Sequence, residues 1–371
     1  MSHTVLEIDL NALEHNYNYL RSKLRPEVKM LAVVKAYAYG SESAHIAKKL
    51  ESLGVAYFAV AYASEGIALR EAGIQTPILV LHPQIESFSS IIKHCLEPSI
   101  YSFRVLKAFI EIAENQNLNE YPVHIKFNTG LNRLGFKDVN EAEILQHLKE
   151  TKAVKVRSLF SHLVASEDLN EKTFTLKQIE TFEHNAKNII AGLGYTPMMH
   201  QSNTSAIINY PQAQFDMVRT GIGLYGYGNT QEEDLKLKPV ATLKTIISQI
   251  HEIAVGETVG YNRAHTAAKK ERTATLPIGH ADGISRSYGK GKGYVIINGK
   301  KAPIIGNVCM DMIMVNVTRI DCKEGDEVIV FGKGASAVAL SARIKSIPYE
   351  LITAVSQRVT RKIIDESQEE F

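Results

Sequence analysis

The chain has 371 residues, of which 45% are hydrophobic and 22% are charged, and its formal net charge at pH 7 is +2. These values are typical of a globular protein with room for two domains, and they show no basic stripe that would bind nucleic acid. No signal peptide or membrane span is visible, and three scattered cysteines predict neither a disulfide framework nor a metal site, so we expect a reduced, cytoplasmic protein.

The first 230 residues alternate short apolar segments with amphipathic ones. The expected strands are Met30–Val34, Tyr57–Ala61, Pro77–Leu81, Pro98–Ser102, Val123–Phe127, Val156–Phe160, Thr196–His200 and Met217–Arg219. The clearest expected helices are Asn11–Leu24, Ser64–Ala72 and Leu176–Leu193. About eight strands that alternate with helices predict an α/β fold, a (β/α)8 barrel over residues 1–230, and the competing layout is a doubly wound open sheet.

The pattern changes after residue 230. A polar stretch, residues 229–239, is typical of a linker, and strands of period two with glycine turns follow it. The expected strands are Val240–Ile253, Ala274–Ile278, Gly293–Ile297, Ala302–Val308, Met312–Val317 and Glu327–Phe331, with a hairpin turn at Asn298-Gly299. Residues 231–371 are therefore predicted to form an all-β domain, against which the first few residues of the chain could also pack.

Lys35 ends the first apolar strand and is followed by small residues, tyrosines and Gly40. Burying an ammonium group without a partner is costly, so a lysine in this place needs an explanation. One explanation is that the amine is used chemically, for example to form a Schiff base with an aldehyde cofactor. The alternative is a lysine whose amine reaches solvent from the strand end.

The other predicted strand ends also carry nitrogen-rich side chains. In a barrel these ends meet at one face, where the active site lies. The residues in question are Lys126, Asn128, Arg133, His162, His200 and Arg219. Such a set predicts a site that binds an anion and uses a covalent amine.

A glycine-rich segment, Gly221–Gly226, follows the last of these strands. It has the spacing GxGxxG, but it lacks the following helix and the acidic residue of a dinucleotide site. A phosphate cradle is the better interpretation, because glycines let backbone N–H groups approach an anion, here beside the Thr204 and Ser205 hydroxyls.

Taken together, these motifs resemble one family, the pyridoxal-phosphate-dependent alanine racemases, over nearly the whole chain. The blocks that carry the resemblance are Glu7–Leu13, Val33–Gly40, Lys126–Phe136, Ser161–His162, His200–Asn203, Val218–Gly226, Val259–Tyr261, Pro277–Gly283, Val308–Met312, Ile347–Glu350 and Arg358–Arg361. So many ordered blocks are specific, although VVKA or GxGxxG alone would not be.

The resemblance implies pyridoxal 5'-phosphate as cofactor, bonded to Lys35, and alanine as substrate. The implied cofactor-binding residues are Lys35, Tyr39, His162, Asn203, Thr204, Arg219, Gly221, Ile222 and Tyr349. Arg133 would lie near the substrate carboxylate. Tyr261 would be a second catalytic base delivered by the partner subunit of a homodimer, with Met310 and Asp311 lining the same side. Lys126 occupies a position at which relatives can carry a carbamylated lysine.

These implied roles agree with the chemistry of racemisation. Two bases on opposite faces of Cα, Lys35 and Tyr261, exchange its proton more simply than one base that must swing across. Arg219 cannot give up its proton, so it would leave the pyridine nitrogen unprotonated and suppress side reactions such as transamination. The implied function is interconversion of L- and D-alanine for peptidoglycan synthesis.

Some positions depart from the family pattern, and other functions remain open. His280, Tyr37, Asn128 and Asn132 replace the commoner Tyr, Asn, Asp and Gly, and Thr204 replaces Ser but keeps the hydroxyl. A racemase of broader specificity, for serine or other amino acids, is the main alternative. A decarboxylase is disfavoured by Arg219, and a non-catalytic cofactor carrier is disfavoured by the second domain.

Overall fold

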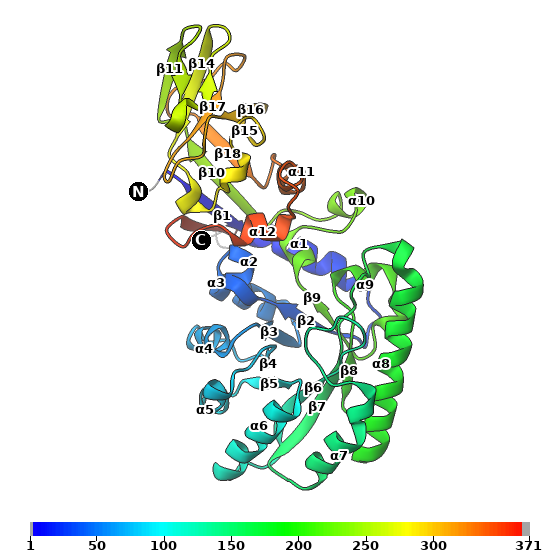
Figure 1. Ribbon diagram of the computed structural model, residues 1–371. Coiled ribbons are helices and arrows are strands. Elements are labelled where there is room, and N and C mark those ends of the chain that lie inside the picture. The colour runs from blue at the N-terminus through cyan, green and yellow to red at the C-terminus, as the bar shows by residue number, and fades with distance from the viewer. Residues whose placement is uncertain (1–2, 366–371) are drawn as a thin grey trace.

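The computed structural model describes residues 3–365, apart from the side chain of Gln231. Two sheets organise the chain (Figure 1): a closed ring of strands wrapped by helices, and a twisted sheet that extends from one end of it. The two ends of the chain meet in the twisted sheet, because β1 (Val5–Asp9) and β19 (Thr360–Ile364) are neighbouring strands at its edge.

The ring is a barrel of eight parallel strands in the order β8-β7-β6-β5-β4-β3-β2-β9. Its strands are β2 (Lys29–Val33), β3 (Tyr57–Val60), β4 (Ile78–Val80), β5 (Glu97–Ile100), β6 (Tyr121–Lys126), β7 (Val154–Phe160), β8 (Met198–His200) and β9 (Met217–Thr220). Each overlaps a strand expected from the sequence. The predicted barrel is therefore confirmed, and the doubly wound sheet is excluded.

The barrel closes because β9 pairs with β2, and because the Asp216 N–H donates to the Met199 carbonyl between β9 and β8. Where both faces of a barrel strand are covered, the strand can be apolar without alternation, as in β3 and β4. In β3 all four residues are buried.

Helices cover the outside of the barrel. They are α1 (Leu10–Arg21), α3 (Ser43–Ser52), α4 (Ala63–Glu71), α5 (Phe88–Lys93), α6 (Phe103–Asn115), α7 (Glu141–Lys149), α8 (Lys172–Leu193) and α9 (Thr204–Asn209). The Asp9 carboxylate caps α1 by accepting from the backbone N–H groups of Asn11 and Ala12. The left-handed Gly194 ends α8, where the sequence predicted its end.

The second sheet has nine strands in the order β11-β14-β17-β16-β15-β18-β10-β1-β19. Beside β1 and β19 these are β10 (Ala241–Ile246), β11 (Gln249–Ile253), β14 (Glu271–Leu276), β15 (Tyr294–Ile297), β16 (Lys300–Ile305), β17 (Ile313–Asn316) and β18 (Glu327–Phe331). A two-stranded ribbon, β12 (Thr258–Val259) and β13 (His265–Thr266), accompanies it. The predicted turn at Asn298-Gly299 is present, with both residues at positive φ.

Some predictions for this part of the chain were wrong in detail. The single strand expected over Val240–Ile253 is two strands, β10 and β11, which pair with different neighbours. The short helices α11 (Ala337–Ala342) and α12 (Pro348–Thr353) were not expected. The stretch 229–239 contains the helical turn α10 (Gln231–Asp234), and Asn16 of α1 holds its end by hydrogen bonds with Lys238.

Within residues 3–365, no helix combines the length and the apolar character that crossing a bilayer requires. The longest helix, α8, is amphipathic and lies against the barrel (Figure 1).

Candidate active site

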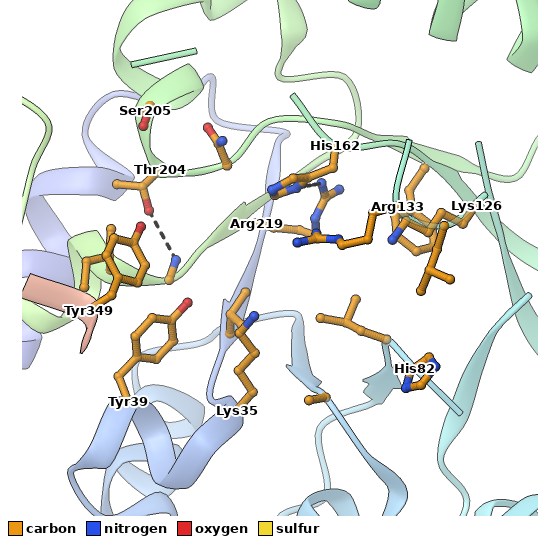
Figure 2. Close-up of a pocket in the computed structure, with 18 of the residues that line it drawn as sticks. Lys35, Tyr39, His82, Lys126, Arg133, His162, Thr204, Ser205, Arg219 and Tyr349 are labelled. Carbon is orange, nitrogen blue, oxygen red and sulfur yellow. Dashed lines mark hydrogen bonds between the residues drawn. The ribbon is translucent and has the colours of Figure 1, made fainter. Parts of the chain in front are cut away.

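A cavity of about 530 Å³ opens at the carboxyl ends of the barrel strands. It brings together residues that the sequence analysis took from separate strand ends or from the family resemblance. These are Lys35, Tyr39, Lys126, Arg133, His162, Asn203, Thr204, Arg219, Gly221, Ile222 and Tyr349. Hydroxyls gather at one end (Tyr39, Thr204 and Tyr349), cations at the other, and Lys35 points in between them (Figure 2).

The cavity has a strong positive character. Four of its lining side chains are Lys35, Lys126, Arg133 and Arg219, and within residues 3–365 no aspartate or glutamate lines it. Like charges brought together in a low-dielectric site repel, unless an anion joins them. This arrangement is suited to a ligand with negative charge at more than one point.

The segment that carries Lys35 has an unusual backbone. After β2 the chain enters a short turn, α2 (Lys35–Gly40), in which the four residues Ala36–Tyr39 all have φ between 50° and 56°. Left-handed helical turns of L-residues cost about 1–2 kcal/mol per residue, so this turn needs support from its surroundings. No element had been predicted from the sequence for this segment.

Glu65 of α4 supports the start of this turn. One oxygen of its carboxylate accepts from the Ala36 N–H at 2.6 Å, and the other accepts from the Ala61 and Tyr62 N–H groups at 2.7 and 3.1 Å. Charge-assisted bonds of this kind are about twice as strong as neutral ones. Glu65 thus ties the residue after Lys35 to the end of the neighbouring strand β3.

Arg361 of β19 supports the other end of the turn. Its guanidinium donates to the backbone carbonyls of Gly40, Ser41, Val355, Ser356 and Val359. Gly40 has φ +81°, and a Cβ there would overlap the Ile352 carbonyl of α12. The turn is therefore held directly against the segment that carries Tyr349.

The hydroxyl end of the cavity is built on close contacts. The Tyr39 ring stacks on Tyr225 with ring centroids 4.4 Å apart. Thr204 Oγ1 accepts from the Gly221 N–H at 3.2 Å, the dashed line in Figure 2. A Cβ on Gly221 would overlap the Tyr39 hydroxyl, so only glycine leaves room beside these donors.

Arg219 is buried, with 5% of its surface exposed. Its two terminal nitrogens donate to the carbonyls of Ser161, His200 and Gln201, and they contact Nδ1 of His162 and His200. Within the described residues its Nε–H has no hydrogen-bond partner. Burial lowers the pKa of Arg219 to about 9, so the group stays cationic at neutral pH.

The lysines of the cavity are shifted toward their neutral forms. Burial lowers the pKa of Lys35, the charge of Arg133 lowers it further, and Glu65 opposes the shift. Burial and the charges of Arg133, Arg219 and Lys35 lower the pKa of Lys126 to about 8. Burial and the same cationic set lower the pKa of His162 well below its ordinary value. The neutral amine is the nucleophilic form of lysine, and burial shifts both lysines toward it.

Three predicted site residues lie elsewhere. Tyr261, in the turn Tyr261–Arg263, is 74% exposed and borders a separate surface cavity together with Met310 and Asp311. None of the three lines the barrel cavity. Asp311 is instead paired with Arg358. A single chain therefore divides the predicted site between two places.

Sequence reasoning missed the residues that hold the site in shape, namely Glu65, Tyr225 and Arg361. The signal for Glu65 was its place in the first turn of α4, where a carboxylate commonly accepts backbone N–H bonds. Tyr225 and Arg361 lie in two of the blocks that carry the family resemblance, but no local pattern predicted their supporting role, because their partners lie far away in the sequence.

Comparison with protein families places the chain clearly. Residues 8–229 match the family "Alanine racemase, N-terminal domain", and residues 240–363 match "Alanine racemase, C-terminal domain". The chain is 36% identical to an alanine racemase of Halothermothrix orenii, and the match covers 97% of this chain and 96% of that protein.

Solved structures give the same result. The chain is similar to an alanine racemase from Clostridium difficile 630, with a TM-score of 0.91, 34% identity and coverage of 99% and 97% of the two chains. It is also similar to an alanine racemase from Bartonella henselae with covalently bound pyridoxal phosphate, with a TM-score of 0.90, 27% identity and coverage of 98% and 100%.

Proposed function

This chain belongs to the alanine racemase family and is an isomerase that interconverts L- and D-alanine; we propose that it works with pyridoxal phosphate in the barrel cavity and with two proton-transfer groups, Lys35 and Tyr261. The observation that carries this proposal is the Lys35 amine, which burial shifts toward its neutral form between a hydroxyl-lined and a cationic end of one cavity.

The residues present fit the proposed cofactor. The Tyr39, Thr204 and Tyr349 hydroxyls and the backbone N–H groups at Gly221 and Ile222 would hold its phosphate, in a space that a Cβ at position 221 would fill. The unpartnered Nε–H of Arg219 would face its pyridine nitrogen, and His162 and Asn203 would complete the wall. Lys35 would provide the amine to which the aldehyde attaches.

Bound pyridoxal phosphate draws electrons away from Cα of an amino acid and so acidifies the Cα proton. Arg219 would limit this effect, because it would donate to the ring nitrogen without giving up its proton. Proton exchange at Cα would then be favoured over reactions that need a stronger electron sink.

Two groups would move the Cα proton. We assign one face to Lys35 Nζ, whose pKa burial shifts in favour of the neutral amine, and the opposite face to the Tyr261 hydroxyl. Arg133 would bind the substrate carboxylate, since it lines the cavity and has no hydrogen bond within residues 3–365. Lys126 lies near Arg133, and carbamylation of its neutral form would give this arginine an anionic neighbour.

A homodimer would unite the two halves of the site. Tyr261, Met310 and Met312 are 74%, 59% and 47% exposed and border one cavity on the second domain. Large exposed apolar side chains that gather in this way commonly mark an interface. We propose that this surface covers the barrel mouth of a second copy, with Asp311 on the same side.

Mixing two inactive variants tests both roles and the dimer. Lys35→Ala and Tyr261→Phe chains are each expected to be nearly inactive alone. If the subunits are co-expressed, each mixed dimer has one site with both native residues and one site with neither. Random assortment then restores about 25% of the wild-type activity per chain.

The outcome separates the alternatives. If Tyr261 acted in its own chain, mixing would restore nothing. If Tyr261 had no catalytic role, the Tyr261→Phe chain alone would be active. Bound cofactor, followed by its visible absorbance, is expected in the Tyr261→Phe chain, and a panel of L-amino acids assayed for D-products measures how strictly alanine is preferred.

A further inference from the structure

A line of hydrogen-bonded side chains crosses the inside of the barrel behind the cavity. It contains one residue from each of five consecutive strands: Glu97 of β5, His124 of β6, Ser158 of β7, His200 of β8 and Arg219 of β9. All five are buried, with at most 9% of their surface exposed. Barrel interiors are normally filled by branched apolar side chains, so this line, which we call the relay, needs a reason.

Every link of the relay is short. Arg219 Nη1 lies 2.8 Å from His200 Nδ1, and His200 Nε2 lies 2.8 Å from Ser158 Oγ. Ser158 Oγ lies 2.6 Å from His124 Nδ1, and His124 Nε2 lies 2.7 Å from Glu97 Oε2. The His200 ring is also stacked on Phe160, with ring centroids 4.9 Å apart. In both histidines, each of the two ring nitrogens therefore makes a hydrogen bond to the next member of the relay.

The donors of the relay determine its direction. A guanidinium has only donors, so His200 Nδ1 must be the acceptor and the ring proton must lie on Nε2. That N–H donates to Ser158. Ser158 in turn donates to His124 Nδ1, and the proton on His124 Nε2 goes to the Glu97 carboxylate. All four bonds then run the same way, from Arg219 to Glu97, through two neutral histidines.

The opposite arrangement leaves groups unsatisfied. A cationic His124 would donate to Ser158 from Nδ1, and the Ser158 proton would then have no acceptor, because this hydroxyl contacts only the two imidazoles among the described residues. A buried hydroxyl proton without an acceptor is costly. A cationic His200 would point a proton at Arg219. Burial and the charge of Arg219 also lower the pKa of His200 well below its ordinary value.

We propose that Glu97, His124, Ser158 and His200 are positioning residues for Arg219, and that Glu97 supplies through them the negative charge that the cavity itself lacks. Hydrogen bonds aligned in one direction polarise one another, so the carboxylate makes His200 Nδ1 a stronger acceptor for the guanidinium. The relay thereby holds Arg219 with its Nε–H toward the cavity. This inference rests on the proposed function only for its effect on catalysis.

Histidine tautomers provide the first test. In the full-length enzyme labelled with ¹⁵N-histidine, NMR is expected to show His124 and His200 neutral and protonated at Nε2 at pH 7, with or without cofactor. A proton on Nδ1 of His200, or a cationic His124, would overturn the inference. This measurement needs no variant.

The second test cuts the relay. Glu97→Gln removes the charge but keeps an acceptor, and it is expected to move the His200 ¹⁵N signals and to lower kcat about 10-fold with little change in KM, at the lower end of what partners of functional histidines contribute. In a Ser158→Ala background the same change is expected to have no further effect on either readout. Coupling of this kind reports a shared path.

Ser99→Ala is the matched control. Ser99 lies on β5 and is also buried, pairs in register with His124, and its hydroxyl has no partner among the described residues. In this background Glu97→Gln is expected to keep its full effect. Equal effects of Glu97→Gln in the Ser158→Ala and Ser99→Ala backgrounds would overturn the relay. Correct tautomers in an enzyme without racemase activity would instead refute the proposed function and leave the relay standing.

Discussion

Lys35 and its neighbours line a cationic cavity at the barrel mouth, whereas Tyr261 and Met310 stand on an open surface of the second domain. The first region is lined by residues of one chain. The second offers a phenol and apolar side chains to solvent. From this difference we expect that one chain binds the cofactor, and that proton transfer on both faces of Cα requires two subunits.

The two regions also differ in how they are held. A left-handed turn carries Lys35, and Glu65 and Arg361 support it by charge-assisted hydrogen bonds from distant segments. The turn around Tyr261 also contains two residues at positive φ, Asn262 and Arg263, but among the described residues a single side-chain hydrogen bond, from Asn307 to the Tyr261 carbonyl, supports it. We therefore expect the barrel side to tolerate little change and the Tyr261 side to depend on its partner.

The largest expected effect separates the two regions by chemistry. Lys35→Ala and Tyr261→Phe should each lower kcat about 10³-fold, within the range of general acid–base groups. Only Lys35→Ala should abolish the absorbance of covalently held cofactor. Steady-state assays and spectra of the two purified variants check this, and equal loss of the absorbance in both would contradict the division.

A second change tests the support of the Lys35 turn. Arg361→Ala removes donors from five backbone carbonyls and should lower the free energy of unfolding by about 3 kcal/mol. Denaturant titration measures the effect. Lys362→Ala, on the next and exposed residue of β19, is the control and should change stability by less than about 0.5 kcal/mol. Similar values for both variants would show that Arg361 does not hold the turn.

A third change addresses the open region. Met310→Glu places a charge on the surface that we expect a second copy to cover, and it should raise the dimer dissociation constant about 10-fold or more. Analytical ultracentrifugation measures this, and cofactor binding should survive. Val139→Glu changes another exposed apolar residue, on the barrel, and should leave the dimer intact. An unchanged dimer in Met310→Glu would remove this surface from the interface.

The smallest effect concerns pH. The folded pKa of Lys126 is about 8, below the value of 10.5 for the unfolded chain, so between these values the unfolded state binds more protons. Stability should therefore rise with pH in this window, and fall as pH decreases toward 8. Between pH 8 and 9.5, in carbonate-free buffer, the wild type should gain about 1.5 kcal/mol relative to Lys126→Met.

The Lys126→Met variant lacks the titrating group, so it is its own control. Parallel stability curves for the two proteins would mean that the amine does not titrate in this range. Carbamylation would give that result, and the mass of the intact chain would reveal it.

The barrel, the sheet-rich second domain and the residues at the strand ends could all be predicted from the sequence alone. Apolar residues recur with the period of the strand or helix that buries them, so the elements can be found from the sequence. The carboxyl ends of barrel strands meet at one face, so the residues there could be grouped into one site. The resemblance to one family then assigned a role to each residue. Local patterns even placed the Asn298-Gly299 turn and the end of α8 correctly.

The hydrogen bonds that support the Lys35 turn, and those that connect Arg219 to the relay, could be found only in the tertiary structure. The left-handed turn is unfavourable locally and exists because Glu65, Arg361 and α12 reach it from elsewhere in the chain. The relay from Glu97 to Arg219 spans five strands, and nothing in its sequence spacing connects its members. Interactions between residues far apart in the chain leave no periodic trace, and so they become visible only when the strands are side by side.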